Sequence, residues 1–429
     1  MPDLTRLGAA LVDAAHAGER ASSGLSQAIG REQLGPSQAE ELSGLVYGAL
    51  RRSERAKATL AELGVPGARC EQGVLLVLAA SLLEKRLDVQ AARELVGDVN
   101  WENFEAADAR VLERAAGASK VALLGSLPLW LAERLVVEYP DAEALAASLS
   151  EPPPRALRVN GLVVDAQEGR ERLVSEGARV SPGRWAKRAL LLSGAFNPFA
   201  TRAFHEGVFE QQDEGSQLVC ELVAPPPRGL VLDACAGAGG KTLAVAAALA
   251  GRGKVLALDV DEGKLTELRR RAKRARAVNV QALAIEAQGE LPDAVRDSAG
   301  KVDRLLIDAP CSGTGVLRRN PEARARLSPD AVARLVKAQA EIVERMLPLL
   351  APGGRLVFAT CSLLRAEGEE LFDALEARHS ELEPVNLAEI FDRAYVERFA
   401  RSAPHRLRVL PHLHDTDGFF VTCLRRRRP

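Results

Sequence analysis

Apolar residues near the start of the chain recur at spacings of three and four, which predicts amphipathic helices. One clear example comprises Leu42, Leu45, Val46, Ala49 and Leu50. The stretch 73–87 is apolar on almost every side, a pattern typical of the central helix of a bundle. Because strand patterns are lacking and Gly-Pro breaks separate the apolar segments, residues 1–140 are predicted to form an all-helical domain.

Two runs of three prolines, at 152–154 and 225–227, mark breaks further along the chain. Proline runs are stiff and extended, so they commonly separate folded regions. Residues 155–224, between these breaks, mix helical and strand-like patterns. The sequence therefore predicts a small α+β linker domain there, followed by a larger domain over 225–429.

From Gly229 onward, apolar runs of strand length alternate with amphipathic helical stretches. The predicted strands are 229–234, 254–259, 280–285, 304–308 and 355–359, and the predicted helices are 241–250, 262–276, 329–350 and 367–378. This alternation is typical of an α/β fold in which helices cover both faces of a parallel sheet. Two further strands, 406–410 and 419–424, are predicted to pair antiparallel and to close the sheet edge.

A glycine-rich turn joins the first strand of this sheet to its first helix. After Asp233 it contains Cys235, Ala236, Gly237, Ala238, Gly239, Gly240 and Lys241. Glycines let the backbone turn sharply and approach a ligand closely. Asp259 ends the second strand, where a carboxylate accepts hydrogen bonds from ribose hydroxyls, so the pair of features predicts a nucleoside-binding site.

Two other interpretations of this turn are less well supported. A phosphate loop would need glycine at position 235, where this chain has cysteine, and no convincing magnesium-binding strand follows. A purely structural glycine turn is possible for the loop alone, but the ribose-binding carboxylate argues against it.

Two cysteines follow later strands of the predicted sheet: Cys311 in the run Asp-Ala-Pro-Cys-Ser-Gly-Thr-Gly, and Cys361 in Ala-Thr-Cys-Ser. Each opens a polar turn, where a thiol is accessible for chemistry. Either one alone is as readily a buried small hydrophobic residue. Their joint occurrence favours a covalent mechanism in which a second thiol assists.

Composition narrows the classes of protein that remain. The 429 residues are 47% hydrophobic and 27% charged with a net charge of −1, so nucleic-acid binding would depend on local basic patches. None of the six cysteines forms a Cys-x-x-Cys pair and histidine is sparse, so no metal site is expected. No signal peptide and no apolar run of membrane-spanning length is found, which favours a cytoplasmic protein with reduced thiols.

Taken together, these motifs resemble the RNA cytosine-5 methyltransferases, a family that includes bacterial ribosomal RNA enzymes and the eukaryotic nucleolar and Sun proteins. The resemblance covers about 155–424 and is carried by the glycine loop, the run 308–321 and Thr360-Cys361-Ser362, with further matches at 157–160, Gln212-Asp213 and 417–420. It implies a Rossmann-like methyltransferase sheet and S-adenosylmethionine as the cofactor. The implied cofactor contacts are Cys235, Ala236, Gly237, Ala238, Gly239, Gly240, Lys241, Asp259, Gln288 and Asp308, with Glu286 as a rival to Gln288.

The chain departs from the family pattern in two places. It has Gly237-Ala238 where Ala-Pro is usual, which changes the rigidity of the glycine loop. It also has Glu367-Gly368 where Glu-Asn often follows the second cysteine.

The chemistry of such a reaction accounts for the three candidate catalytic residues. Carbon 5 of cytosine is a weak nucleophile until a thiolate adds to carbon 6 and forms an enamine. The resemblance implies that Cys361 is this nucleophile, that Cys311 helps release the product, and that Asp308 binds ring nitrogen 3 and the exocyclic amine. Arg318 or Arg319 could favour the thiolate. In the DNA cytosine-5 enzymes the Pro-Cys cysteine attacks instead, which would exchange the roles of the two thiols.

The segment 38–52 resembles the helical RNA-binding domain related to the antiterminator NusB, which precedes the catalytic part in a bacterial branch acting on small-subunit ribosomal RNA. The predicted substrate is therefore 16S ribosomal RNA. A transfer RNA substrate, or an RNA-binding protein of ribosome assembly without transferase activity, are the alternatives. The basic run 269–276 is either a solvated helix face or a phosphate contact, and Arg158 and Asn160 are candidates for holding the RNA backbone.

Overall fold

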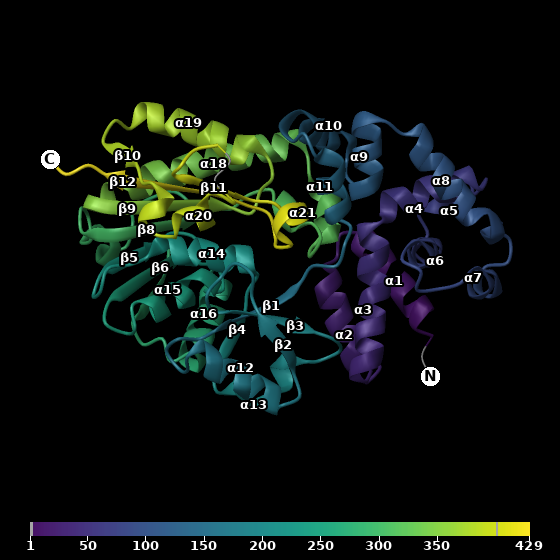
Figure 1. The fold of residues 1–429 in the computed structure, drawn as a ribbon, viewed down its shortest axis with the longest axis horizontal. Helices are drawn as coiled ribbons and strands as arrows, with labels where there is room; N and C mark the ends of the chain where they lie inside the picture. Colours follow the sequence, from purple (N-terminus) through teal and green to yellow (C-terminus); the bar gives the residue numbers. More distant parts are fainter. Residues whose placement is uncertain (1–2, 400–401) are drawn as a thin grey trace. The chain divides into compact units, whose positions relative to one another are not determined.

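A computed structural model describes residues 3–399 and 402–429 of the chain. The chain divides into two compact units (Figure 1). The first unit contains the chain up to Pro153 together with Val316–Pro329, and the second contains Pro154–Gly315 together with Asp330–Pro429. Among the described helices, none is both long enough and apolar enough to cross a membrane.

The first unit is helical, as its apolar spacing predicted. Its helices are α1 (Leu4–His16), α2 (Ala21–Arg31), α3 (Pro36–Arg51), α4 (Ser53–Glu62), α5 (Gly67–Cys70), α6 (Gly73–Leu83), α7 (Val89–Leu95), α8 (Phe104–Arg114), α9 (Gly117–Gly125), α10 (Leu129–Glu138) and α11 (Ala142–Ser148). Helix α6 is the central one, since Leu75, Leu76 and Leu78 are fully buried against α1, α3 and α4. It ends at Leu83, earlier than predicted, because Lys85 takes a left-handed backbone conformation (φ 55°) that a helix cannot continue.

A distant segment of the chain completes this unit. The 3₁₀ helix η4 (Pro321–Arg326) packs against α1 and α3. Arg51 Nε donates a hydrogen bond to the carbonyl of Arg318 (2.8 Å), and Arg324 Nη2 donates to the carbonyl of Leu149 (2.9 Å). No sequence pattern predicted that the residues after the first cysteine motif would join the helical unit.

The second unit begins with a small antiparallel sheet of order β2-β3-β1-β4. Its strands are β1 (Arg155–Val159), β2 (Arg179–Pro182), β3 (Ala189–Ser193) and β4 (Phe209–Gln211), with helices α12 (Ala166–Ser175) and α13 (Arg202–His205). The mixed α+β content predicted for this region is confirmed. The domain boundary at 224 stays a prediction, because helix α14 (Glu214–Val223) packs into the core of the larger sheet that follows.

The larger sheet has the order β10-β12-β9-β8-β5-β6-β7, and β11 also pairs with β12. The strands are β5 (Leu230–Asp233), β6 (Lys254–Asp259), β7 (Val280–Ala284), β8 (Val302–Asp308), β9 (Leu350–Thr360), β10 (Leu382–Pro384), β11 (Arg406–Val409) and β12 (Phe419–Arg426). Strands β5 to β9 pair in parallel, and β12 runs antiparallel to β9. The predicted antiparallel pair, β11 with β12, is confirmed, and the short strand β10 extends the same edge.

Successive residues of the strands point to opposite faces of this sheet, and each face has its own helical cover (Figure 1). Val231, Val255 and Leu306 pack with α14 and α15 (Gly240–Ala248). Leu232 and Leu305 pack on the other side with α18 (Pro329–Met346) and α19 (Glu369–Arg378). The prediction of a parallel sheet with helices on both faces is therefore confirmed.

Candidate active site

Polar side chains stand where the central parallel strands end. Asp233 closes β5, Asp259 closes β6, Asp308 closes β8, and Cys361 directly follows β9. Since these strands are parallel neighbours, their carboxyl ends lie at one edge of the sheet, which is where ligands bind in open α/β folds. The structure thus brings together most of the residues singled out from the sequence.

The glycine loop between β5 and α15 has the conformation that its sequence requires. Gly237 and Gly239 have positive φ angles (53° and 86°), which other residues rarely adopt. A Cβ on Gly239 would lie 2.7 Å from Leu268 Cγ, whereas a Cβ on Gly237 would meet nothing within 4 Å. The Gly237 amide donates a hydrogen bond to Asp259 Oδ2 (2.7 Å), so the loop is tied to the end of β6 with open space at Gly237.

The family pattern has a proline in this loop, and this chain does not. Two arginines hold the loop instead. Arg271 Nη1 donates to the carbonyl of Ala238 (2.7 Å), and Arg158 Nη1 donates to the carbonyl of Gly240 (2.7 Å). Arg158 is buried and also bonds Gln212. The small sheet and helix α16 (Glu262–Arg274) therefore hold the backbone of the glycine loop.

The prediction that Arg158 and Asn160 hold an RNA backbone is wrong. Both side chains are buried, and Asn160 Nδ2 donates to the carbonyls of Gly207 and Ala275 (2.9 Å each). The side-chain N–H groups of Arg158 and Asn160 donate to carbonyl groups of the protein itself. These two residues therefore position the site and do not contact a nucleic acid.

The basic run 269–276 divides into an inner and an outer face. Arg271 and Arg274 both form ion pairs with the buried carboxylate of Glu210. The other four basic residues of the run, Arg269, Arg270, Lys273 and Arg276, are exposed. The inner arginines have a structural role, and a phosphate contact by the exposed residues stays a prediction.

Lys241 and Asp308 form a close ion pair at the mouth of the sheet. Lys241 Nζ lies 2.6 Å from Asp308 Oδ2 and 5.3 Å from the ring centre of Phe419. Burial lowers the pKa of Lys241, but attraction to Asp308 and to neighbouring thiols, Cys361 among them, outweighs it and leaves that pKa raised. Lys241 is therefore a fixed positive charge that interacts with the second cysteine.

Asp233 is buried with one oxygen in use. Thr242 Oγ1 donates to its Oδ2 (2.7 Å), whereas Oδ1 has no partner among the described residues. Burial raises the pKa of Asp233 to about 7, against the hydrogen bond from Thr242, which lowers it. A buried acceptor beside a glycine loop fits a ligand that brings its own hydrogen-bond donor.

This burial should make the stability of the fold depend on the pH through Asp233. The Asp233 carboxyl group ionises near its ordinary pKa of 3.8 in the unfolded chain and near 7 in the folded protein. The free energy of unfolding should therefore be highest below pH 4 and should fall as the pH rises to 7. We expect Asp233→Asn to remove this loss, worth of order 4 kcal/mol. Urea unfolding at pH 4.5 and 7.5 measures it. The exposed Asp297→Asn is the control and should keep the wild-type pH dependence.

The two cysteines face each other across the ends of β8 and β9. Cys311 Sγ lies 3.4 Å from Cys361 Sγ, and both thiols are partly exposed. The hydrogen bond to Cys361, together with burial and the nearby negative charge, raises the pKa of Cys311 well above its usual value. Cys311 is therefore a neutral thiol at physiological pH, and its S–H can donate to the sulfur of Cys361.

Glu367 joins the two cysteine loops, and the sequence did not single it out as a site residue. It is fully buried; its Oε1 accepts hydrogen bonds from the Ser312 amide (2.9 Å) and from Gln339 Nε2 (3.0 Å). Its Oε2 accepts from Ser362 Oγ (2.6 Å) and from Ser312 Oγ. The one signal in the sequence was the Glu-Gly pair shortly after the second cysteine.

The structure leaves the predicted third cofactor contact undecided. Gln288 and Glu286 are both exposed in the loop after β7. The guanidinium of Arg345 holds this loop through the carbonyls of Glu286 (2.8 Å), Ala287 (3.1 Å) and Gly289 (2.9 Å). Gln288 as a contact therefore stays a prediction.

Arg318 and Arg319, the cations expected to favour a thiolate, belong to the first unit. Within the second unit, Lys241 is a cation that interacts with Cys361.

Comparison with known proteins adds an independent observation. The family described as "16S rRNA methyltransferase RsmB/F" matches residues 220–425, and a ferredoxin-like domain of RsmF/B-like methyltransferases matches residues 127–197. The chain is 34% identical over 307 residues to a probable ribosomal RNA small subunit methyltransferase B from Bacillus subtilis (strain 168). That match covers 70% of this chain and 67% of the relative.

Two crystal structures share the fold. PH0851 superimposes with a TM-score of 0.79 at 23% identity, covering 99% of both chains. A methyltransferase homolog protein from Pyrococcus horikoshii has a TM-score of 0.62 at 26% identity, covering 73% of this chain and 99% of its own. The predicted Rossmann-like sheet is therefore confirmed.

Proposed function

Because the chain belongs to the 16S rRNA methyltransferase RsmB/F family, we propose that it methylates carbon 5 of a cytosine in small-subunit ribosomal RNA through a covalent cysteine adduct. The coarser activity, an RNA methyltransferase that uses S-adenosylmethionine, follows from family membership. The observation that carries the finer proposal is the 3.4 Å approach of two thiols beside Asp308 at the ends of neighbouring strands.

The residues at the carboxyl edge of the sheet fit this cofactor. Asp259 can accept hydrogen bonds from ribose hydroxyls, and Asp233 Oδ1, which is buried and without a partner among the described residues, can accept one from a charged amino group. The open space at Gly237 lets the ligand approach the loop backbone, and Gln288 or Glu286 is proposed to contact the adenine. When bound, the cofactor supplies an electrophilic methyl group.

Cys361 is proposed as the nucleophile. Its thiolate forms a bond to carbon 6 of cytosine, which turns carbon 5 into an enamine carbon able to accept a methyl group. Asp308 accepts a hydrogen bond from the exocyclic amine, and from nitrogen 3 once that nitrogen has taken a proton from solvent as the thiolate adds, and Lys241 keeps Asp308 in place at 2.6 Å. Loss of the carbon 5 proton then restores the double bond and expels the Cys361 sulfur.

Cys311 is proposed to accept the carbon 5 proton. In the free enzyme its pKa is raised first of all by the hydrogen bond to Cys361. Once Cys361 is bonded to carbon 6, its sulfur carries no negative charge and is a poorer hydrogen-bond partner, so the pKa of Cys311 should fall. The same contact that keeps Cys311 protonated before attack thus lets the partly exposed thiol ionise afterwards by losing its proton to water, and the thiolate then takes the carbon 5 proton.

This assignment predicts a trapped intermediate. Cys311→Ala should retain attack by Cys361 but lose release, so a covalent complex of protein and RNA should accumulate and turnover should fall by about 10²-fold or more. A denaturing gel with end-labelled ribosomal RNA and cofactor detects the slowed band. The double variant Cys311→Ala/Cys361→Ala is the control and should give no band. Equal bands from both variants would contradict the proposed roles.

The helical first unit is proposed to bind RNA, in line with the resemblance of residues 38–52 to a NusB-like domain. Methyl transfer from labelled cofactor, followed by bisulfite mapping of small-subunit ribosomal RNA and transfer RNA, tests the substrate. A methylated cytosine found only in transfer RNA, or no transfer to either RNA, would overturn the proposed substrate.

A further inference from the structure

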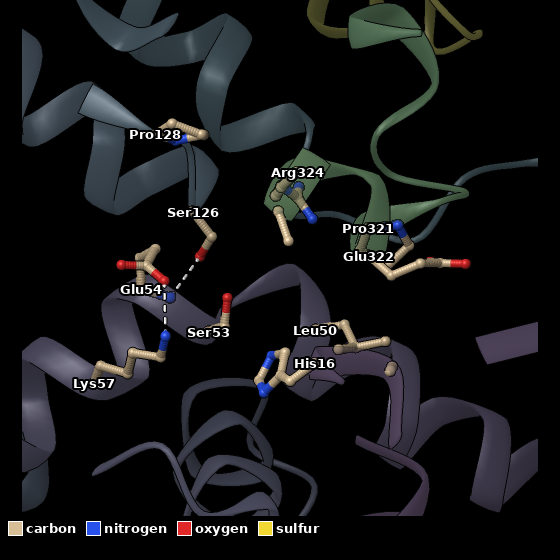
Figure 2. Close-up of a pocket in the computed structure, with 12 residues that line it drawn as sticks. His16, Leu50, Ser53, Glu54, Lys57, Ser126, Pro128, Pro321, Glu322 and Arg324 are labelled. Atoms are coloured by element: carbon tan, nitrogen blue, oxygen red, sulfur yellow. Dashed lines mark hydrogen bonds and ion pairs between the residues drawn. The ribbon is translucent and has the colours of Figure 1, made fainter. Parts of the chain in front are cut away.

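A cavity of about 280 Å³ lies within the first unit (Figure 2). It is bounded by the end of α1, the end of α3, the first turn of α4, the segment between α9 and α10, and η4. The polar residues that line it include His16, Ser53, Glu54, Lys57, Glu322 and Arg324. All of these lie in one compact unit.

Arg324 is the unusual member of this lining. The residue is 6% exposed, and its Nη2 donates to the carbonyl of Leu149 (2.9 Å). Its Nε and Nη1 atoms are buried and have no hydrogen-bond partner among the described residues. Burial and, less strongly, nearby Arg51 lower the pKa of Arg324 to about 9, and the weaker attraction to Glu322 and Glu54 does not restore it, so the group remains charged at neutral pH. A buried cation with unused donors is destabilising unless an anion compensates it.

A second feature of the cavity favours the same kind of ligand. The ten-residue helix α4 begins at Ser53, so its first turn, the positive end of the helix, lines the cavity. Figure 2 shows the Ser53 hydroxyl, the His16 ring and the Arg324 side chain facing the same space. Hydrogen-bond donors from three separate segments therefore converge there.

The two carboxylates in the lining attract Arg324 but do not outweigh the effect of its burial. Glu54 is bonded by Lys57 Nζ at 3.1 Å, and its amide donates to Ser126 Oγ at 3.3 Å. The carboxyl group of Glu322 points away from the space that Arg324 faces (Figure 2). Glu54 and Glu322 also line the cavity, but the space between Arg324, Ser53 and His16 is faced by the side chains of those three residues and by the first turn of α4.

We propose that this cavity binds a phosphate group, which Arg324 and the first turn of α4 hold, and that the RNA backbone supplies it. A guanidinium offers paired N–H donors that match the oxygens of a phosphate. Only the choice of RNA as the source rests on the proposed function.

Thermal unfolding of the full chain in inorganic phosphate tests the site directly. At constant ionic strength, with chloride as the reference salt, phosphate should raise the Tm of the wild type in a saturable way, by about 2 °C or more. Arg324→Met should have a higher Tm than the wild type without phosphate, because it removes a cation whose burial outweighs the attraction of Glu322 and Glu54, and should show no response to phosphate. Arg326→Met, an exposed arginine of the same 3₁₀ helix, carries the same charge change and should respond like the wild type.

A phosphate response that persists in Arg324→Met, or that is absent from the wild type, would overturn the site. The source of the phosphate is tested by fluorescence anisotropy with labelled small-subunit RNA. Arg324→Met should weaken RNA binding by about tenfold and Arg326→Met by less than about threefold. Unchanged RNA affinity together with a lost phosphate response would assign the site to free phosphate and overturn the RNA source. Neither measurement needs methyl transfer, so failure of the proposed reaction would be seen separately.

Discussion

Replacing Cys361 by alanine should abolish methyl transfer to RNA, lowering turnover by about 10⁴-fold or more, while cofactor binding is retained. The reason is that the covalent step has no substitute: without a thiolate at carbon 6, carbon 5 stays too weak a nucleophile. Cofactor binding should survive because the glycine loop, Asp233 and Asp259 lie on other strands. Transfer from labelled cofactor and isothermal titration with unlabelled cofactor give the two quantities.

The same variant has a second expected readout that does not depend on turnover. The hydrogen bond to Cys361 is the largest cause of the raised pKa of Cys311, so Cys361→Ala should lower that pKa and speed alkylation of Cys311 near neutral pH. Cys423→Ala is the control, because this thiol is buried on β12 and burial raises its pKa to about 12. It should change neither turnover nor the reactivity of Cys311.

If Cys361→Ala still formed a covalent complex with RNA and Cys311→Ala did not, the two thiols would have exchanged roles. The positions of the thiols alone do not decide between these assignments, since both sulfurs stand at strand ends 3.4 Å apart. What separates them is the surroundings. Lys241 interacts with Cys361, while Cys311 has a raised pKa and shares its loop with Asp308.

The sequence predicted the larger sheet well because its strands carry strong, continuous apolar runs. Strand β6 has the bounds predicted for it, 254–259, and the other parallel strands differ mainly at their ends. The largest difference is at β9, which begins at Leu350 instead of 355. Pro352 and the two glycines after it interrupt the apolar run, but the ladder continues through an irregularity in which Val302 pairs with Leu350 and Arg304 with Arg355.

The sequence could not predict contacts that depend on tertiary packing of polar residues. Arg158 and Arg271 were basic residues near a predicted RNA site, yet they hold the carbonyls of the glycine loop. The segment carrying Arg324 showed no pattern that would place it in the helical unit. Hydrophobic periodicity reports which face of an element is buried, but it does not report which distant carbonyl a buried arginine will meet.

Glu367 is the clearest case, and its removal should have the second largest effect. Glu367→Ala would leave the Ser312 amide, Gln339 and two serine hydroxyls without their acceptor in a fully buried position. Unsatisfied buried donors cost about 1–3 kcal/mol each when they cannot find new partners. Some of them will rearrange, so we expect the free energy of unfolding to fall by about 2–4 kcal/mol.

Turnover should fall as well, by about 10²-fold, since Glu367 connects Ser312, one residue after Cys311, to Ser362, one residue after Cys361. A shift of about 1 Å between reacting groups is enough for a loss of that size. Urea unfolding and single-turnover methyl transfer measure the two effects. Glu341→Ala, an exposed carboxylate on α18, should leave both unchanged, and Glu367→Gln should recover most of the stability because an amide fills the same space.

A Glu367→Ala protein with wild-type stability and turnover would mean that the two cysteine loops hold their positions without this carboxyl group. The direct bond from the Gly315 amide to the Cys361 carbonyl (2.9 Å) would then have to be sufficient on its own.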